Sequence, residues 1–302
     1  MTQPKLNSQG LIAALCATAT WGMVGVFVRW LPGWSPFAVL AGRFLVATAT
    51  MLPILFVASS VRHDLTRSLR TPLIWGLSLP AIGSYVLGTT AFQMAPVGEV
   101  TLLFTTSPLF IIAYKYLVHL PIKRTEGLGM LLATAGVCLI MVPQLSTDQT
   151  VSWQTIAGYL LALSAAGLLS LYVFWLNVLT QQKIAPKSIE VVFLTCLLGS
   201  ILSLLCEIFF SKLSIGSSID ERAILVLLGL GILSTVLPFW CYTVAVQRLP
   251  IVLATAILLL EPMFAVLFAS IALQEIPSLW FGMGSVLILW GLLLIAREAS
   301  AA

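Results

Sequence analysis

The stretch Leu258-Leu259-Leu260-Glu261-Pro262-Met263-Phe264 places a carboxylate and a proline inside a long apolar run of the chain. A charged group at the centre of a bilayer costs about 3 kcal/mol on insertion scales, so such groups usually face a cavity or a partner rather than lipid. Pro262 lacks an N–H and leaves the carbonyl of Leu258 without its helical donor. We therefore expect a helix that is interrupted at this point inside a membrane.

The first half of the chain carries a related stretch, Thr105-Thr106-Ser107-Pro108-Leu109-Phe110. Both stretches contain the pattern Pro-x-Phe, and the first has a serine where the second has the acid. Two interrupted helices in corresponding places are the best sequence indication of a transporter's substrate site. Thr105, Ser107 and Glu261 are therefore candidate substrate-binding residues.

The composition sets the class of protein. Hydrophobic residues make up 60% of the 302 residues and charged residues 9%, which excludes an ordinary soluble protein. Apolar runs of about 20 residues are long enough to cross the ~30 Å hydrocarbon core of a bilayer as helices. We expect an all-α integral membrane protein with ten transmembrane helices, at residues 10–30, 36–58, 72–93, 98–119, 126–144, 153–178, 188–210, 222–247, 250–274 and 277–296.

The lysines and arginines between these spans and near their ends predict the orientation. With a cytoplasmic amino terminus, the inner side holds Lys5, Arg62, Arg67, Arg70, Lys115, Lys123, Arg124, Lys183, Lys187, Arg248 and Arg297, and the outer side only Arg29, Lys212 and Arg222. This positive-inside bias predicts that both termini are cytoplasmic, in the inner membrane of a bacterium. The net charge of +4 is small, and it does not indicate a nucleic-acid partner.

The two halves of the chain match under a shift of 154 residues. Pro96, Thr101, Pro108 and Phe110 fall on Pro250, Thr255, Pro262 and Phe264. The match predicts two duplicated five-helix units, residues 1–149 and 150–302. Because five is an odd number, the second unit must enter the membrane from the opposite side, which gives inverted repeats.

Two glycine strings continue the match after a one-residue slip. Gly127-x-Gly129 with Gly136 corresponds to Gly282-x-Gly284 with Gly291. Small residues let membrane helices approach closely, so we expect the fifth and tenth helices to pack against neighbours or against a second protomer. The pattern leaves both a monomer and a homodimer open.

Arg43 lies about seven residues into the second span, roughly 10 Å below the outer surface. One half thus supplies a buried cation, and the other supplies a buried anion at Glu261. One interpretation is an Arg43–Glu261 bridge, or separate polar contacts that hold the helices together. In the other, these residues line the substrate cavity, where Arg43 matches a carboxylate and Glu261 matches an amine or a coupling proton.

Further candidates lie beside prolines and glycines in the middle of spans, because interrupted backbone is tolerated only where protein or a water-filled cavity surrounds it. The remaining predicted substrate-binding residues are Trp21, Ser84, Tyr85, Tyr172, Trp175 and Trp240. For each single aromatic residue, packing or a place in the interfacial belt is the alternative role.

Other kinds of chemistry find little support in the residues. His63 lies in a link and His119 is the last residue of its span, and no G-x-S-x-G or H-E-x-x-H string is present, which argues against an intramembrane enzyme. The five cysteines form no C-x-x-C pair, so we expect neither a disulfide framework nor a metal site, and no cofactor. A non-transporting scaffold remains an alternative.

A family resemblance rests on motifs in both halves: Ala19-Thr20-Trp21-Gly22, Pro36 with Arg43-Phe44, Ser107-Pro108-Leu109-Phe110, and Glu261-Pro262 with Glu275 before a glycine-ribbed last helix. With these motifs the chain resembles the EamA-type branch of the drug/metabolite transporter superfamily. The resemblance implies ten helices in two inverted repeats and a central cavity formed chiefly by helices 1, 3, 4, 6, 8 and 9. It also implies a secondary transporter that exports or exchanges small metabolites, such as amino acids or amphipathic compounds, by alternating access.

Overall fold

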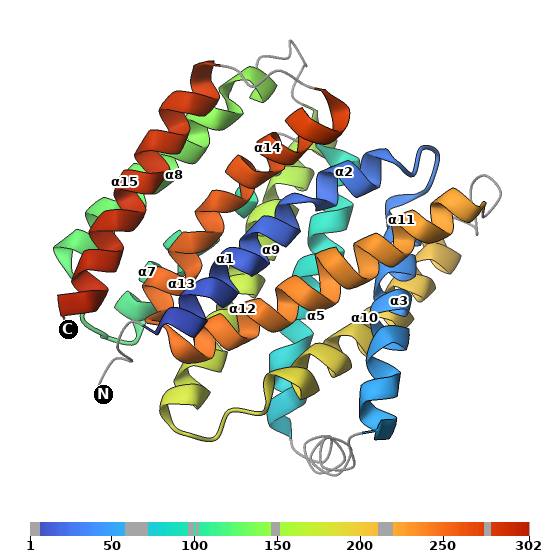
Figure 1. The fold of residues 1–302 in the computed structure, drawn as a ribbon, viewed down its shortest axis with the longest axis horizontal. Coiled ribbons are helices and arrows are strands. Elements are labelled where there is room, and N and C mark those ends of the chain that lie inside the picture. The colour runs from blue at the N-terminus through green and yellow to red at the C-terminus, as the bar shows by residue number, and fades with distance from the viewer. Residues whose placement is uncertain are drawn as a thin grey trace.

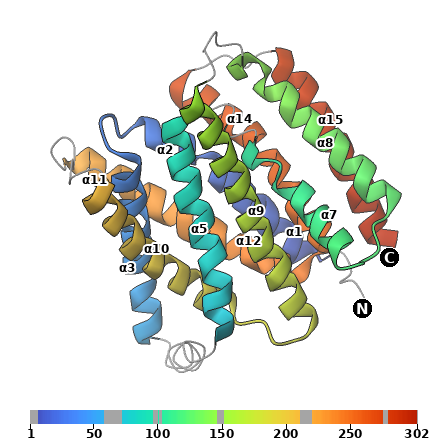
Figure 2. The ribbon, with the colours of Figure 1, turned by 180° about the vertical axis from the view of Figure 1, so that it is seen from behind.

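The computed structural model describes residues 7–57, 72–95, 100, 103–145, 152–210, 220–274 and 279–301. The first half contains α1 (Ser8–Gly22), which leads into α2 (Val24–Arg29), then α3 (Pro36–Val57), α5 (Pro72–Met94), α7 (Ser107–Leu117) and α8 (Arg124–Leu145). Within these ranges every regular element is a helix (Figures 1 and 2). The expected all-α class is confirmed.

The second half contains two composite helices. After α9 (Trp153–Gln181) and α10 (Ser188–Phe210) come α11 (Glu221–Gly231), a π-helix (Ile232–Val236) and α12 (Leu237–Arg248), which follow one another without a break. The next helix consists of α13 (Ile251–Ile257), a 3₁₀ turn (Leu258–Leu260) and α14 (Glu261–Leu273), and α15 (Leu279–Ala301) follows it.

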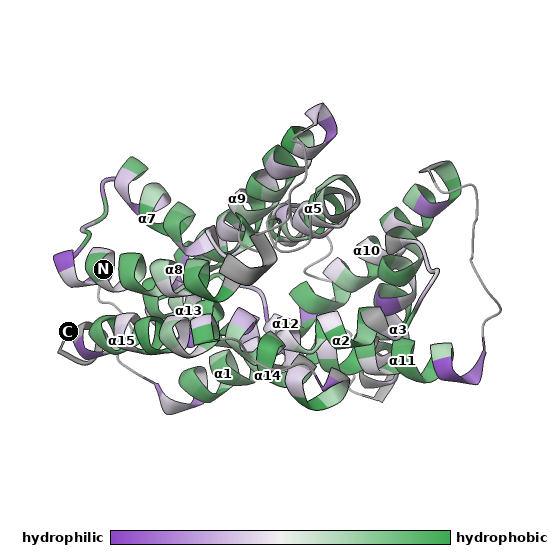
Figure 3. Ribbon diagram, turned by 90° about the horizontal axis from the view of Figure 1, so that it is seen from above, coloured by the Kyte–Doolittle hydropathy of each residue, from purple (hydrophilic) through white to green (hydrophobic). Residues whose placement is uncertain are grey.

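With α1 and α2 counted as one helix, and each composite helix counted once, the described residues form ten helices. Six helical segments are long and apolar enough to cross a membrane, and a shorter apolar helix covers Phe37–Pro53. The six segments are Ser8–Val28, Trp153–Gln181, Ser188–Phe209, Glu221–Arg248, Ile251–Ala272 and Leu279–Arg297. Figure 3 shows apolar residues along every labelled helix, with the most hydrophilic residues mainly at helix ends.

The structure confirms both expected interruptions. A turn at Thr105 and Thr106 precedes α7, which begins at Ser107 with Pro108 in its first turn. The 3₁₀ turn precedes α14, which begins at Glu261 with a proline at the equivalent place. Proline is favoured in the first turn of a helix because its missing N–H would have no partner there. The two helices therefore begin at residues that correspond under the shift of 154.

Equivalent helices of the two halves make equivalent contacts. The first helix of each half packs on the third helix of the other: α1 on α12, and α9 on α5. The first helix of each half also contacts the interrupted helix of the other, because α1 packs on α14 and α9 on α7. The second helices, α3 and α10, pack together, as do the fifth, α8 and α15, which run side by side in Figures 1 and 2.

The glycine strings form the contact between α8 and α15. A Cβ added at Gly129 would lie 2.7 Å from the carbonyl oxygen of Gly291, and one at Gly136 would lie 2.5 Å from that of Gly284. Because the later glycine of α8 meets the earlier glycine of α15, the two helices run antiparallel. The predicted close packing is thus confirmed, and it occurs against a neighbour in the same chain.

We expect Gly136→Ala to destabilise the protein by about 1–3 kcal/mol, since the added methyl group would overlap backbone atoms that cannot move aside. Gly127→Ala is the matched control on the same helix, because a Cβ at Gly127 has no atom within 4 Å. Thermal unfolding of the two purified variants in detergent measures the difference. Equal melting temperatures would contradict the close contact between α8 and α15.

Candidate substrate site

Arg43 is held by the π-helix in the middle of the eighth helix. Its Nε donates a hydrogen bond to Thr235 Oγ1 at 2.9 Å, and its Nη2 donates to the carbonyl of Ser234 at 2.8 Å. In an α-helix the N–H of residue 238 would serve that carbonyl, but Pro238 has none. The guanidinium therefore replaces a backbone donor that the sequence has removed.

The π-helix also connects two further helices to this point. Ser234 Oγ donates to the carbonyl of Thr20 in α1 at 3.0 Å, and Thr235 Oγ1 donates to the carbonyl of Leu230 at 2.9 Å. Arg43, which is 8% exposed, also lies 5.5 Å from the ring centre of Tyr85 on α5. π-helical turns are frequent at functional sites, and this one fixes a positive charge among α1, α3, α5 and α12.

Glu261 lies near this charge but is not bonded to it. Its side chain is half-buried, and among the described residues it forms no hydrogen bond and no ion pair. It is close enough to Arg43, Tyr85 and Tyr242 to interact with them electrostatically. The sequence left open an Arg43–Glu261 bridge, and the structure shows separate polar groups instead.

The position of Glu261 at the first residue of α14 follows from the break in the ninth helix. The N–H of Glu261 donates to the carbonyl of Leu258 in the 3₁₀ turn, and the partial positive charge at the start of a helix favours a carboxylate there. The interruption thus allows an acid to stand inside the membrane and leaves its oxygens available to a ligand.

Three aromatic residues from different helices surround these charges. The rings of Trp21 on α1 and Tyr242 on α12 meet edge to face with centroids 5.3 Å apart, and Tyr85 meets Phe44 in the same way at 5.1 Å. Tyr242 is completely buried, yet its hydroxyl has no hydrogen-bond partner in the part of the chain that the structure describes. Of the predicted candidates, the structure brings together Trp21, Arg43, Tyr85 and Glu261.

Tyr242 was not among the predicted residues, whereas Trp240 was. Successive residues of an α-helix are 100° apart, so positions 240 and 242 point to nearly opposite sides of α12. Trp240 is 48% exposed on the outer surface of the helix, and Tyr242 is buried at the centre. Its position near Pro238 led to the choice of Trp240, and Tyr242 lies only two residues further along. The hydrophobic pattern there did not reveal which of the two rings faces inward.

Two of the remaining candidates, Ser84 and Tyr172, have hydrogen-bond partners of their own. Ser84 Oγ donates to the carbonyl of Ala81 in its own helix at 2.7 Å. Tyr172, which is fully buried, forms a hydrogen bond with Thr243 Oγ1 at 2.8 Å and lies near Tyr85 and Tyr242. These contacts join α9 to α12 at the edge of the central group.

Two candidates lie at the start of the first interrupted helix, and a third, Trp175, packs on α5. The carbonyl of Ser107 accepts a hydrogen bond from Ser170 Oγ at 2.7 Å, which ties the start of α7 to α9. Thr105 lies in the turn just before α7. Trp175 on α9 covers Gly76 of α5, where a Cβ would come 2.5 Å from the indole ring.

Comparison with known proteins assigns the class. The model of the EamA-like transporter family matches residues 8–142 and again residues 156–297, and the chain belongs to this family. An uncharacterized transporter of Clostridium kluyveri (strain ATCC 8527) is 25% identical over 259 residues, which cover 85% of this chain and 82% of the relative. A protein of known crystal structure has 19% sequence identity and a TM-score of 0.79, with 98% of this chain and 99% of that chain covered. This last likeness shows the fold alone.

Proposed function

We propose that this chain is a secondary transporter of small metabolites that carry an ammonium group, such as amino acids and amphipathic amines. It exports or exchanges them by alternating access to the central group of Trp21, Arg43, Tyr85, Tyr242 and Glu261. The observation that carries the proposal is the carboxylate of Glu261, which has no hydrogen-bond or ion-pair partner among the described residues and lies within electrostatic range of Tyr85 and Tyr242.

A carboxylate beside aromatic faces suits an ammonium group. The carboxylate supplies the opposite charge, and the π-systems of tryptophan and tyrosine attract cations by about 0.5–2 kcal/mol each. Arg43 donates through Nε and Nη2, while its Nη1 makes no hydrogen bond to a described residue and is available to a substrate carboxylate. The unpartnered hydroxyl of Tyr242 offers one further donor. An amino acid can therefore bind Arg43 with its carboxylate and Glu261 with its ammonium group. A simple amine can bind Glu261 alone.

The arrangement of the helices supports alternating access. Equivalent helices of the two halves make equivalent contacts, and α8 and α15 run antiparallel. Both observations support inverted repeats at residues 1–149 and 150–302. Halves related in this way can exchange conformations and so open a midplane site first to one side and then to the other. With the positive-inside rule, both termini are cytoplasmic and the membrane is a bacterial inner membrane. One chain contains the whole site, so the monomer suffices for transport, with or without a homodimer.

Three ligands with the same aromatic body test the assignment of the charges. L-phenylalanine carries both charges, 2-phenylethylamine only the ammonium, and 3-phenylpropionate only the carboxylate. We expect the first two to bind saturably to the purified protein, and the third at least about tenfold more weakly, which corresponds to 1.4 kcal/mol. Equal binding of 3-phenylpropionate would contradict the role of Glu261, and no saturable binding of any of the three would favour a scaffold.

Proton coupling is the second part of the proposal. When the substrate leaves, its ammonium group is replaced at Glu261 by a proton, which relieves a charge that would otherwise remain unpaired inside the membrane. We expect an imposed pH gradient to accelerate the flux of 2-phenylethylamine into proteoliposomes. A flux that ignores the gradient would instead indicate facilitated diffusion or exchange of one substrate for another.

A further inference from the structure

A buried ion pair joins the helices on either side of the link between α7 and α8. Lys115 Nζ lies 2.8 Å from Glu126 Oε2, and the two side chains are only 3% and 7% exposed. The same oxygen accepts a hydrogen bond from the backbone N–H of Lys123 at 3.3 Å. Lys115 stands in the last turn of α7 and Glu126 in the first turn of α8, where the helix dipoles favour a cation and an anion respectively. From sequence, Lys115 counted only as one of the inner-side charges.

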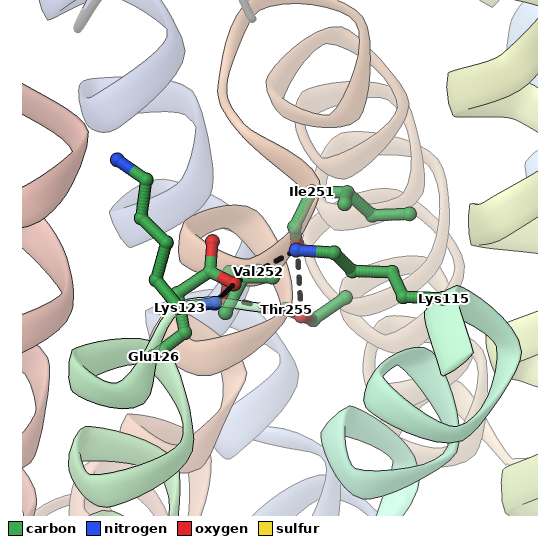
Figure 4. A network of polar contacts seen from close by, with 6 residues as sticks. All are labelled: Lys115, Lys123, Glu126, Ile251, Val252 and Thr255. Carbon is green, nitrogen blue, oxygen red and sulfur yellow. Dashed lines mark hydrogen bonds and ion pairs between the residues drawn. The ribbon is translucent and has the colours of Figure 1, made fainter. Parts of the chain in front are cut away.

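The ion pair rests on the interrupted helix of the other half. Figure 4 shows the ammonium of Lys115 beside Ile251 and Thr255 in the first turns of α13. α13 contacts both α7 and α8. The hydroxyl of Thr255 donates to the carbonyl of Ile251 at 2.8 Å, so its proton is not shared with Glu126. The Lys115–Glu126 pair thus covers the contact between the two halves at the end where the ninth helix begins.

The side chains of the ninth helix are buried at this end, whereas at the other end they are partly exposed. Every residue of α13 and of the 3₁₀ turn, from Ile251 to Leu260, is buried. Among the side chains of α14 that the structure describes, only Pro262 is buried, and Ile271 is 79% exposed. Protein therefore surrounds the ninth helix on the side of α13, whereas α14 is partly exposed at the surface of the molecule.

The aligned positions of the second half carry no such pair. Under the shifts that align the repeats, Lys115 corresponds to Ala269 and Glu126 to Phe281, and neither of these is charged. Buried ion pairs carry a large desolvation cost, which water removes when the site opens. The pair is therefore stable in two situations, as a dry contact when α13 lies against it, and as two solvated charges when α13 has moved away.

We propose that the Lys115–Glu126 pair is the gate on the α13 side, which by the orientation given above is the cytoplasmic side. It holds α7 and α8 together as a surface on which α13 closes, and it becomes hydrated when this side opens. The inference rests on the proposed transport function. Because the other half has no equivalent, the gate favours the state that is closed on the α13 side.

Hydrogen–deuterium exchange of the full-length protein tests the gate without any substrate. In Glu126→Gln and in Lys115→Met, we expect the amide groups of residues 251–257 to exchange about tenfold faster than in the wild type, while residues 129–140 of α8 keep the wild-type rate. Lys183→Met is the matched control, since Lys183 is an exposed lysine in the link between α9 and α10.

Two results would overturn the gate. One is exchange in residues 251–257 that changes no more than in Lys183→Met. The other is an equal acceleration in α13 and α8, which would mean that the pair merely stabilises the whole fold. Because the measurement needs no ligand, failure of the gate and failure of amine binding are separate outcomes.

Discussion

Glu261→Gln is expected to lower the affinity for 2-phenylethylamine at least about a hundredfold, or 2.7 kcal/mol, while the protein remains folded. Glutamine keeps the shape of the side chain and its place at the start of α14, but it removes the charge that faces the ammonium group. A lost partner of a charged hydrogen bond in a buried site costs an amount of this order. Isothermal titration of the purified variant measures the loss.

Glu221→Gln is the matched control for this substitution. Glu221 is also the first residue of a helix, α11, but it is exposed and far along the chain from the central group. This variant should bind the amine like the wild type. Wild-type affinity in Glu261→Gln would remove the acid from the site and with it the proposed substrate class.

Arg43→Met is expected to give the largest loss of stability in the central group, about 3 kcal/mol in the free energy of unfolding. The apolar stem remains, but the carbonyl of Ser234 loses its donor, and Pro238 cannot replace it. A buried carbonyl without a partner costs about 1–3 kcal/mol, and Thr235 loses a hydrogen bond as well. The stability of Arg43→Lys should lie between that of the wild type and that of Arg43→Met, since an ammonium group cannot make both hydrogen bonds with the geometry of a guanidinium group.

A double-mutant cycle isolates the cause. Pro238→Ala returns a backbone N–H to the helix, so that the Ser234 carbonyl depends less on Arg43. The double variant Arg43→Met, Pro238→Ala should therefore lose less stability than the sum of the two single changes, with an interaction of about 1 kcal/mol. Additive losses in thermal or chemical unfolding would show that the guanidinium does not substitute for the missing N–H.

The sequence predicted the features that follow from local chemistry. Prolines at positions 108 and 262 lack a backbone donor, and each stands in the first turn of a helix that follows a break. The repeated glycines predicted a close helix contact, since only glycine admits a second backbone at that distance. Both arguments need no knowledge of the partner helix.

The features that depend on the partner could not be predicted in this way. The Ser234-Thr235 dipeptide carries no signature of a π-helix, so the partner of Arg43 was not evident. Lys115 and Glu126 are separated by a link, and only the packing of α13 shows that they are buried. Tyr242 and Trp240 lie in the same apolar run, and the helical phase that separates them is set by contacts with α1 and α9.

Carbodiimide modification of the native protein in sealed vesicles tests most directly whether Glu261 lies in a site that opens to each side of the membrane in turn. A membrane-impermeant carbodiimide and an amine nucleophile are added from one side or from the other, and mass spectrometry measures the amide formed at Glu261. We predict modification from both sides, with protection in each case by the trimethylammonium analogue of 2-phenylethylamine, which carries the same charge but cannot react with the activated carboxyl. An unmodified Glu261 from either side, or modification that this analogue does not reduce, would contradict alternating access to this carboxylate.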